Sequence, residues 1–135
     1  MLKRLIPAVA AALVAAGAAG LAGAAPAQAD AAPQAADSRL MLTWSEGDGT
    51  ASRSATLHCR PAGGTHPSAA DACAALESAG GDFSSLRPSG GACTMEYRPV
   101  QVSARGHWGA EPVDYSETFS NPCTARNGTD GVFAF

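Results

Sequence analysis

Strict alternation of apolar and polar positions marks two short segments in the first half of the chain, residues 39–44 and 54–59. The alternating apolar residues are Leu40, Leu42 and Trp44 in the first segment and Ala55, Leu57 and Cys59 in the second. Such a period of two is typical of a strand with one buried face. Because Gly47-Asp48-Gly49 lies between the segments and predicts a turn, we expect the two strands to form an antiparallel pair.

A second pair of strands is predicted further along the chain. One strand begins at residues 100–102, Val-Gln-Val, and the sequence 105–109, Arg-Gly-His-Trp-Gly, is interpreted as the hairpin connection that follows it. The returning strand has Val113, Tyr115 and Phe119 on one face. Glu117 is the exception on that face. Residues 132–135, Val-Phe-Ala-Phe, predict a short apolar strand at the C-terminal end.

One helix is predicted between these pairs. It begins with a capping box of Ser68 and Asp71, continues through Cys73 and Leu76, and ends at Gly80-Gly81, which can adopt left-handed backbone angles. Residues 124–127 predict a further helical turn. These elements together predict an α+β fold in which a helix packs on one face of an antiparallel sheet.

The N-terminal 29 residues have the order of a secretory signal peptide. Lys3 and Arg4 precede an apolar run over residues 5–21, and Ala27-Gln28-Ala29 matches the cleavage motif. We therefore predict a signal peptide at 1–29, a flexible arm at 30–38 and one domain at 39–135, secreted to the extracellular space. The apolar run is short and alanine-rich and no second one follows, so we expect no membrane attachment after cleavage.

Charge and motifs exclude several classes of function. Without the two basic residues of the signal peptide, the chain has seven scattered arginines against 12 acidic residues, so its acidic balance argues against nucleic-acid binding. Nucleophile-elbow, zinc-protease, phosphate-loop and dinucleotide motifs are absent from the sequence. We expect neither an enzyme nor a cofactor. Asn127-Gly128-Thr129 matches a glycosylation sequon, which we interpret as a turn.

The four cysteines all lie after the signal peptide, at positions 59, 73, 93 and 123. An even number in an exported chain predicts two disulfides, for which three connectivities are possible. We favour Cys59 with Cys73 and Cys93 with Cys123, because each bridge then closes its own local segment. A zinc site is not expected, since the sequence has no C-x-x-C pair and its histidines lack ligand spacing.

The segment around Met95 combines an anchor, an apolar side chain and a stiff end. Gly90-Gly91 leads the chain away from the domain, Cys93 can anchor it two residues before Met95, and Pro99 restricts its end. A methionine often fills a core gap, which is the alternative interpretation of Met95. A stiff extended segment that offers one large apolar side chain is typical of a serine protease inhibitor.

Six motifs in this order resemble the Streptomyces subtilisin inhibitor (SSI-like) family of secreted serine protease inhibitors. They are Gly64-Thr65-His66-Pro67, Ala72-Cys73-Ala74, Gly80-Gly81-Asp82, the segment from Cys93 to Val100, Phe119-Ser120-Asn121-Pro122-Cys123, and Val132-Phe133-Ala134-Phe135. The resemblance implies the local disulfide pairing and a five-stranded antiparallel sheet with two short helices. It also implies a homodimer packed through the sheet, to which Trp44 or Trp108 could contribute.

The resemblance also implies a reactive bond, Met95–Glu96, that subtilisin-like proteases read as substrate. The residues implied to contact the protease around this bond are Ala92, Cys93, Thr94, Tyr97 and Arg98. Asn121 resembles a side-chain support of the loop, and Pro99 stiffens its end. Glu96 and Ala92 depart from the larger apolar residues of some family members. A non-inhibitory binding module on the same fold is the alternative function.

Overall fold

The computed structural model describes residues 36–135. The predicted signal peptide at 1–29 and residues 30–35 of the predicted arm lie outside this part. The strands are β1 (Ser38–Glu46), β2 (Ala51–Cys59), β3 (Gly63–Gly64), β4 (Val100–Trp108) and β5 (Glu111–Phe119), and the helices are α1 (Ala69–Ser78), the 3-10 helix η1 (Phe83–Ser85) and α2 (Pro122–Gly128). Ser38, the last residue of the predicted arm, already belongs to β1 and is buried.

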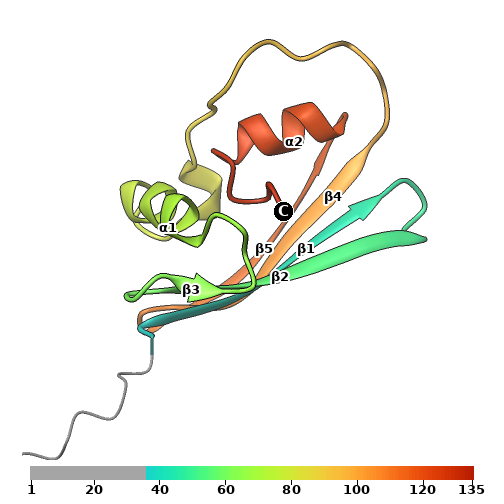
Figure 1. Ribbon diagram of the computed structural model, residues 1–135. Helices are drawn as coiled ribbons and strands as arrows, with labels where there is room; N and C mark the ends of the chain where they lie inside the picture. Colours follow the sequence, from blue (N-terminus) through green and yellow to red (C-terminus); the bar gives the residue numbers. More distant parts are fainter. Residues whose placement is uncertain (1–35) are drawn as a thin grey trace, which may run out of the picture. The chain divides into compact units, whose positions relative to one another are not determined.

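The sheet has five antiparallel strands in the order β3-β2-β1-β4-β5, and both α-helices lie on the same face of it (Figure 1). The predicted pair β1–β2 is confirmed, with Ser38 opposite Cys59 and Glu46 opposite Ala51. The long strand β4 pairs with β1 on one side and β5 on the other. The predicted α+β class is confirmed, and the fifth strand is the two-residue β3.

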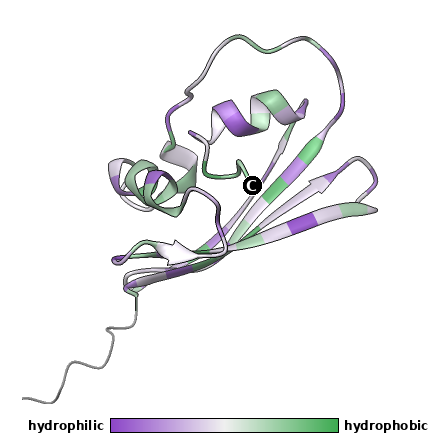
Figure 2. Ribbon diagram, viewed as in Figure 1, coloured by the Kyte–Doolittle hydropathy of each residue, from purple (hydrophilic) through white to green (hydrophobic). Residues whose placement is uncertain are grey.

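The core lies between the sheet and the helices, where the alternating apolar positions meet. Its sheet residues are Leu40, Leu42, Trp44, Leu57, Val100, Val102 and Ala104, and those from the covering segments are Ala72, Leu76, Phe83 and Phe133. Figure 2 shows hydrophobic residues, in green, along β4 and on parts of both α-helices. Fully burying one large apolar side chain stabilises the fold by about 1.5–3 kcal/mol. The alternation in the sequence therefore fixes which sheet face carries the helices.

The start of α1 differs from the predicted capping box. The Ser68 side chain makes no capping hydrogen bond. Instead the Ser68 N–H donates to Nδ1 of His66, whose Nε2 lies 2.8 Å from the Val132 carbonyl oxygen. Because Nδ1 accepts, Nε2 is the nitrogen that donates to Val132. His66 is buried and joins the beginning of the helix to the C-terminal segment.

The predicted hairpin connection at 105–109 is wrong, because β4 continues to Trp108 and the turn follows it. Gly106, which suggested the turn, lies inside the strand with φ +138°. A Cβ at this position would lie 2.1 Å from the carbonyl oxygen of Arg39 on β1. This glycine therefore permits the close approach of two strands and does not mark a turn.

The predicted strand at 132–135 is also wrong. Gly131 has φ +76°, and the Ala134 N–H donates to its carbonyl oxygen at 3.0 Å, so the segment turns back on itself. Val132 and Phe133 are nevertheless fully buried in the core.

Trp44, named above for a dimer interface, is fully buried as well. The guanidinium groups of Arg53 and Arg126 lie over its ring, at 4.6 and 5.1 Å from the ring centroid.

Candidate functional site

An arch without helix or strand, residues 87–99, connects the segment after η1 to β4 and passes above α2 (Figure 1). Two of its side chains stand out by their exposure. Met95 is 98% exposed and Tyr97 is 81% exposed. The alternative interpretation of Met95 as a core methionine is therefore wrong. An apolar side chain that contributes so little to the core is available to a partner.

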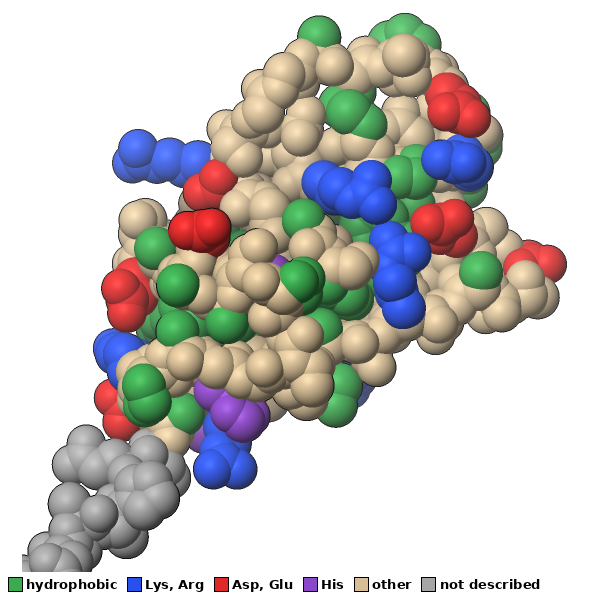
Figure 3. All heavy atoms as spheres, viewed as in Figure 1, with side chains coloured by type: hydrophobic (Ala, Val, Ile, Leu, Met, Phe, Trp, Pro, Cys, Tyr) green, Lys and Arg blue, Asp and Glu red, His purple; other side chains and the backbone are tan. Residues whose placement is uncertain are grey.

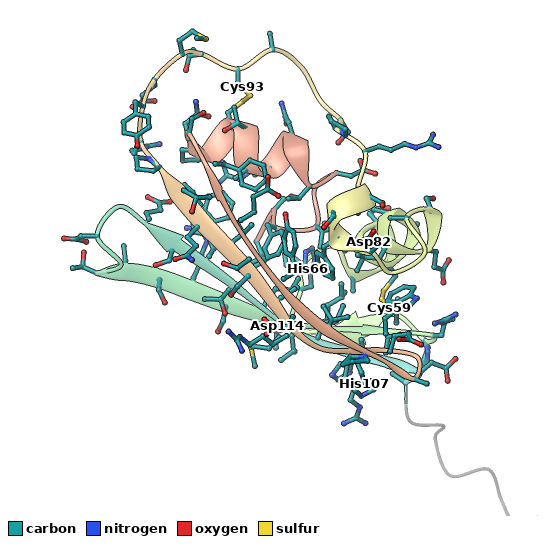
Figure 4. The ribbon with its side chains drawn as sticks, turned by 180° about the vertical axis from the view of Figure 1, so that it is seen from behind. Cys59, His66, Asp82, Cys93, His107 and Asp114 are labelled. Atoms are coloured by element: carbon teal, nitrogen blue, oxygen red, sulfur yellow. A yellow bond between two sulfur atoms is a disulfide. The ribbon has the colours of Figure 1, made fainter. Side chains whose placement is uncertain are left out.

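A disulfide ties this arch, the 87–99 loop, to α2. Cys93 bonds to Cys123, with their Cα atoms 5.7 Å apart. In Figure 4, Cys93 lies directly above α2. The second disulfide, Cys59–Cys73, joins the end of β2 to α1 within the core. The favoured local pairing is thus confirmed for both bridges.

Asn121 forms the N-cap of α2 and contacts the loop at the same time. Its Oδ1 accepts from the Thr124 N–H at 2.9 Å, while Thr124 Oγ1 accepts from the Asn121 N–H, which completes a capping box. Pro122 occupies the first turn, where its missing N–H is tolerated. This arrangement buries Asn121 and leaves its Nδ2 directed at the loop.

The two remaining donors of Asn121 bracket one peptide bond. Nδ2 donates to the carbonyl oxygens of Thr94 at 3.1 Å and of Glu96 at 2.9 Å. These carbonyls belong to the peptide groups immediately before and after Met95–Glu96. Among residues 36–135, no group donates a hydrogen bond to the Met95 carbonyl itself. The structure therefore holds both neighbours of this peptide and leaves its carbonyl open to an external donor.

Backbone hydrogen bonds fix the end of the loop. The Arg98 N–H donates to the Ser120 carbonyl oxygen at 2.8 Å, and the Gly47 N–H donates to that of Pro99 at 3.0 Å. Pro99, which has no N–H of its own, is half-buried, whereas Ala92, Thr94, Glu96 and Arg98 are exposed. The sequence-predicted contact residues thus lie together on one exposed segment, and their supports lie beneath them.

Asn127 also contacts the loop, which sequence reasoning missed. Its Nδ2 donates to the Gly91 carbonyl oxygen at 2.8 Å, and its own carbonyl oxygen accepts from the Ser89 N–H at 2.8 Å. The sequence did single out Asn127, as part of the sequon. Its position four residues after Cys123, on the helix face that carries the disulfide, is the signal that would have indicated a contact with the loop.

The carboxyl group of Glu46 lies near the base of the loop, on the residue that precedes Gly47. Its Oε1 accepts from the Trp44 Nε1–H at 3.0 Å and lies 3.6 Å from Nη1 of Arg53. The hydrogen bond from Trp44, followed by the positive charge of Arg53, lowers the pKa of Glu46 below its usual value of 4.5. The charged form of Glu46 is thus favoured in the folded chain.

We expect acid to weaken the fold through this group. Because the folded pKa is lowered, the stabilisation by Glu46 is fully present above pH 4.5 and is lost as the pH falls through the folded pKa. Glu46→Gln keeps an acceptor for Trp44 but does not titrate. Urea unfolding between pH 5 and pH 2 should therefore show a shallower loss of stability in this variant than in the parent. A residual slope should remain, since Asp48 and Asp82 also have lowered pKa values. Equal slopes in both proteins would contradict this assignment.

A second acidic side chain, Glu117, explains the exception in the pattern of β5. It accepts a hydrogen bond from the Tyr115 hydroxyl, two residues earlier on the same face. Partial burial and this contact raise the pKa of Tyr115 above its usual value of 10.0. Tyr115 stacks on Phe83 of η1, with ring centroids 5.2 Å apart. Glu117 is thus exposed, and its carboxylate serves as the acceptor for Tyr115.

Residues 36–135 contain no group of three or more His, Cys, Asp or Glu side chains that could hold a metal ion. None of the helices in that range is both long and apolar enough to cross a membrane. On the face that Figure 3 shows, acidic and basic side chains are interspersed among neutral atoms.

Comparisons with known proteins give one consistent result. Residues 36–121 match the family described as "Subtilisin inhibitor-like". The chain is 44% identical to the subtilisin inhibitor of Streptomyces violaceus over 138 residues, which covers 94% of both chains. It is 43% identical to subtilisin inhibitor-like protein 1 of Streptomyces cacaoi over 107 residues, which covers 74% of this chain and 97% of the relative.

A solved structure is similar as well. It is the crystal structure of Streptomyces caespitosus sermetstatin in complex with Bacillus licheniformis subtilisin. The similarity has a TM-score of 0.57 at 31% sequence identity and covers 73% of this chain and 98% of the other.

Proposed function

The chain belongs to the subtilisin inhibitor-like family of protease inhibitors, and from this we propose that it blocks subtilisin-like serine proteases by presenting Met95–Glu96 as a substrate. The observation that carries this proposal is a 98% exposed Met95 on a loop that is anchored on both sides. The protein itself acts as an inhibitor and not as an enzyme.

The anchored loop makes binding efficient. A flexible peptide loses conformational freedom when it enters a protease cleft, and each immobilised side chain costs about 0.5–1.5 kcal/mol. Here Asn121, the Cys93–Cys123 bridge and the bond from Arg98 to Ser120 already restrict the backbone. Protease–inhibitor interfaces of the usual size, about 1,600 Å² in total, can therefore be very tight.

The same supports explain why cleavage would not release the protease. Hydrolysis of Met95–Glu96 adds one water and produces a carboxylate on Met95 and an amine on Glu96. The first product end stays attached through Cys93–Cys123, and the second through Arg98 N–H to Ser120. Asn121 bonds to one carbonyl on each side of the cut. The amine therefore remains beside the acyl carbon, and religation competes with release.

Met95 would enter the primary specificity pocket, and the residues around it would lie along the cleft. Thr94, Cys93 and Ala92 would occupy the sites before the bond, and Tyr97 and Arg98 those after it. Asn121 and Pro99 would support the loop from below. The flexible, unbranched side chain of Met95 suits a large apolar pocket. Inhibition should accordingly be strong for subtilisin-like enzymes, weaker for chymotrypsin-like ones and slight for trypsin.

Titration of subtilisin with the purified residues 30–135 tests the proposal. We expect residual activity to fall linearly to near zero at one equivalent of the chain. Brief exposure followed by mass spectrometry should show a single nick between Met95 and Glu96, with the two fragments separable only after reduction. Full protease activity at equimolar chain would reject inhibition and favour the binding module.

Export and dimer formation complete the proposal. The signal-peptide pattern at 1–29 supports secretion, for which release of a chain beginning at Asp30 is the measurement. The sheet face opposite the helices, which includes the half-exposed Met41, supports a homodimer packed through the sheet. Sedimentation equilibrium decides this point, because a single-chain mass at micromolar concentration would exclude the dimer.

A further inference from the structure

We propose that Asn127 is a second positioning residue of the 87–99 loop, which sets the path of the chain before the reactive bond. Asn121 holds the peptides on both sides of Met95–Glu96, whereas Asn127 holds only the segment from Ser89 to Cys93 that leads to it. This inference deepens the proposed inhibitory function and rests on it for its consequences in binding.

The contacts of Asn127 come from both its side chain and its backbone. Nδ2 donates to the Gly91 carbonyl oxygen at 2.8 Å and lies 3.3 Å from Sγ of Cys93. The Asn127 carbonyl oxygen accepts from the Ser89 N–H at 2.8 Å. One residue near the end of α2 therefore fixes the loop at two points, on either side of Gly90.

Gly90 shows how closely the loop lies against Asn127. A Cβ on Gly90 would lie 2.5 Å from Oδ1 of Asn127, and the residue has φ +86°. Both facts require glycine at this position. The loop therefore bends around the Asn127 amide, and no other residue at position 90 could keep this path without a shift.

The two asparagines occupy the two ends of α2, and the disulfide lies between them. Asn121 is the N-cap and Asn127 lies in the last turn, with Cys123 one helical turn before it. The helix and its N-cap thus provide three supports along the loop. Without the Asn127 side chain, the leading segment would keep only the Ser89 bond to the backbone carbonyl of residue 127 and the Cys93 bridge, so Gly91 and Ala92 would lose their fixed path.

The consequences for binding separate the two asparagines. Asn127 makes no hydrogen bond to the loop residues that follow Met95–Glu96. Its loss should therefore weaken the complex without altering the equilibrium between cleaved and intact inhibitor. A lost hydrogen bond of ordinary strength corresponds to a rate change of roughly 3- to 10-fold. Asn121 bonds to both sides of the cut, so its loss should change that equilibrium as well.

The test compares Asn127→Ala and Asn127→Asp with the parent. The aspartate has nearly the same shape but offers no donor to the Gly91 carbonyl. Both variants should dissociate from subtilisin roughly 3- to 10-fold faster. The Ser89 N–H keeps its acceptor, the backbone carbonyl of residue 127, but it should exchange hydrogen faster in the free protein because the segment at Gly91 is no longer held beside it. The ratio of cleaved to intact chain at equilibrium should equal that of the parent, and Asn121→Ala should shift it.

Thr129→Val is the matched control. Thr129 is buried, and its hydroxyl donates to the Ala125 carbonyl oxygen at 2.7 Å at the same end of α2, without touching the loop. It should lower the melting temperature and leave dissociation within twofold of the parent. Dissociation and Ser89 exchange that stay parent-like in Asn127→Asp, or that change equally in Thr129→Val, would overturn the inference. If the parent fails to inhibit subtilisin, the proposed function fails, while Ser89 exchange in the free protein still decides the role of Asn127.

Discussion

Replacing Met95 with lysine is expected to turn the chain from an inhibitor of subtilisin into an inhibitor of trypsin. The trypsin pocket carries a carboxylate, which methionine would leave unpaired and lysine would neutralise. In a large apolar pocket the lysine charge is in turn poorly solvated. Because an unpaired buried charge costs several kcal/mol, each affinity should change by about 100-fold or more, in opposite directions.

This substitution should leave the fold unchanged. Met95 is 98% exposed, and substitutions at such surface positions usually alter stability by no more than about 0.5 kcal/mol. Inhibition constants for both enzymes and a thermal melt of each variant provide the measurement. Met95→Leu should keep subtilisin inhibition, and Tyr97→Lys, with the same charge two residues later, should gain none toward trypsin. A Met95→Lys variant with the parent's two inhibition constants would disprove the assignment of the reactive bond.

Much of the fold could be predicted because its signals are local. Alternation located β1 and β2, since a strand that buries one face needs an apolar residue at every second position. Gly80-Gly81 marked the end of α1, where both residues have positive φ. The even number of cysteines and their positions in the sequence were enough to favour the disulfide pairing that the structure contains.

The predictions that failed concern residues whose roles depend on distant partners. Gly106 suggested a turn, but its need for glycine comes from the Arg39 carbonyl on a neighbouring strand. Residues 132–135 suggested a strand because they are apolar, yet they pack into the core as a turn. Ser68 has the residue type of a helix cap, but its side chain makes no capping bond, and its own N–H donates to the buried His66.

The loop shows the same limit. The exposure of Met95 followed from the residues around it, and the role of Asn121 from the family resemblance. Asn127 was not assigned, because its contacts with Ser89 and Gly91 span more than 30 residues of sequence and only its spacing from Cys123 indicated the loop. An asparagine in a helical turn has many possible partners, and only the folded chain selects one.

Removing the bridge of the loop, in Cys93→Ala/Cys123→Ala, is expected to convert the inhibitor into a substrate. The bridge closes a loop with a sequence separation of 30, so the chain-entropy model predicts a loss of about 3–4 kcal/mol of stability. More importantly, the segment before Met95 would no longer be tied to α2 by a covalent bond. After cleavage the new ends could separate, and hydrolysis would then be faster than religation. Subtilisin activity should therefore recover with time as the variant is degraded.

The second bridge provides a control that separates loop anchoring from stability. Cys59→Ala/Cys73→Ala removes a bridge with a sequence separation of 14, for which the same model predicts a loss of about 3 kcal/mol. That bridge joins β2 to α1 and does not touch the loop. At a temperature where both variants are folded, only the loop variant should show recovery of subtilisin activity. Equal recovery in both would mean that global unfolding, and not release of the Cys93 anchor, exposes the chain to hydrolysis.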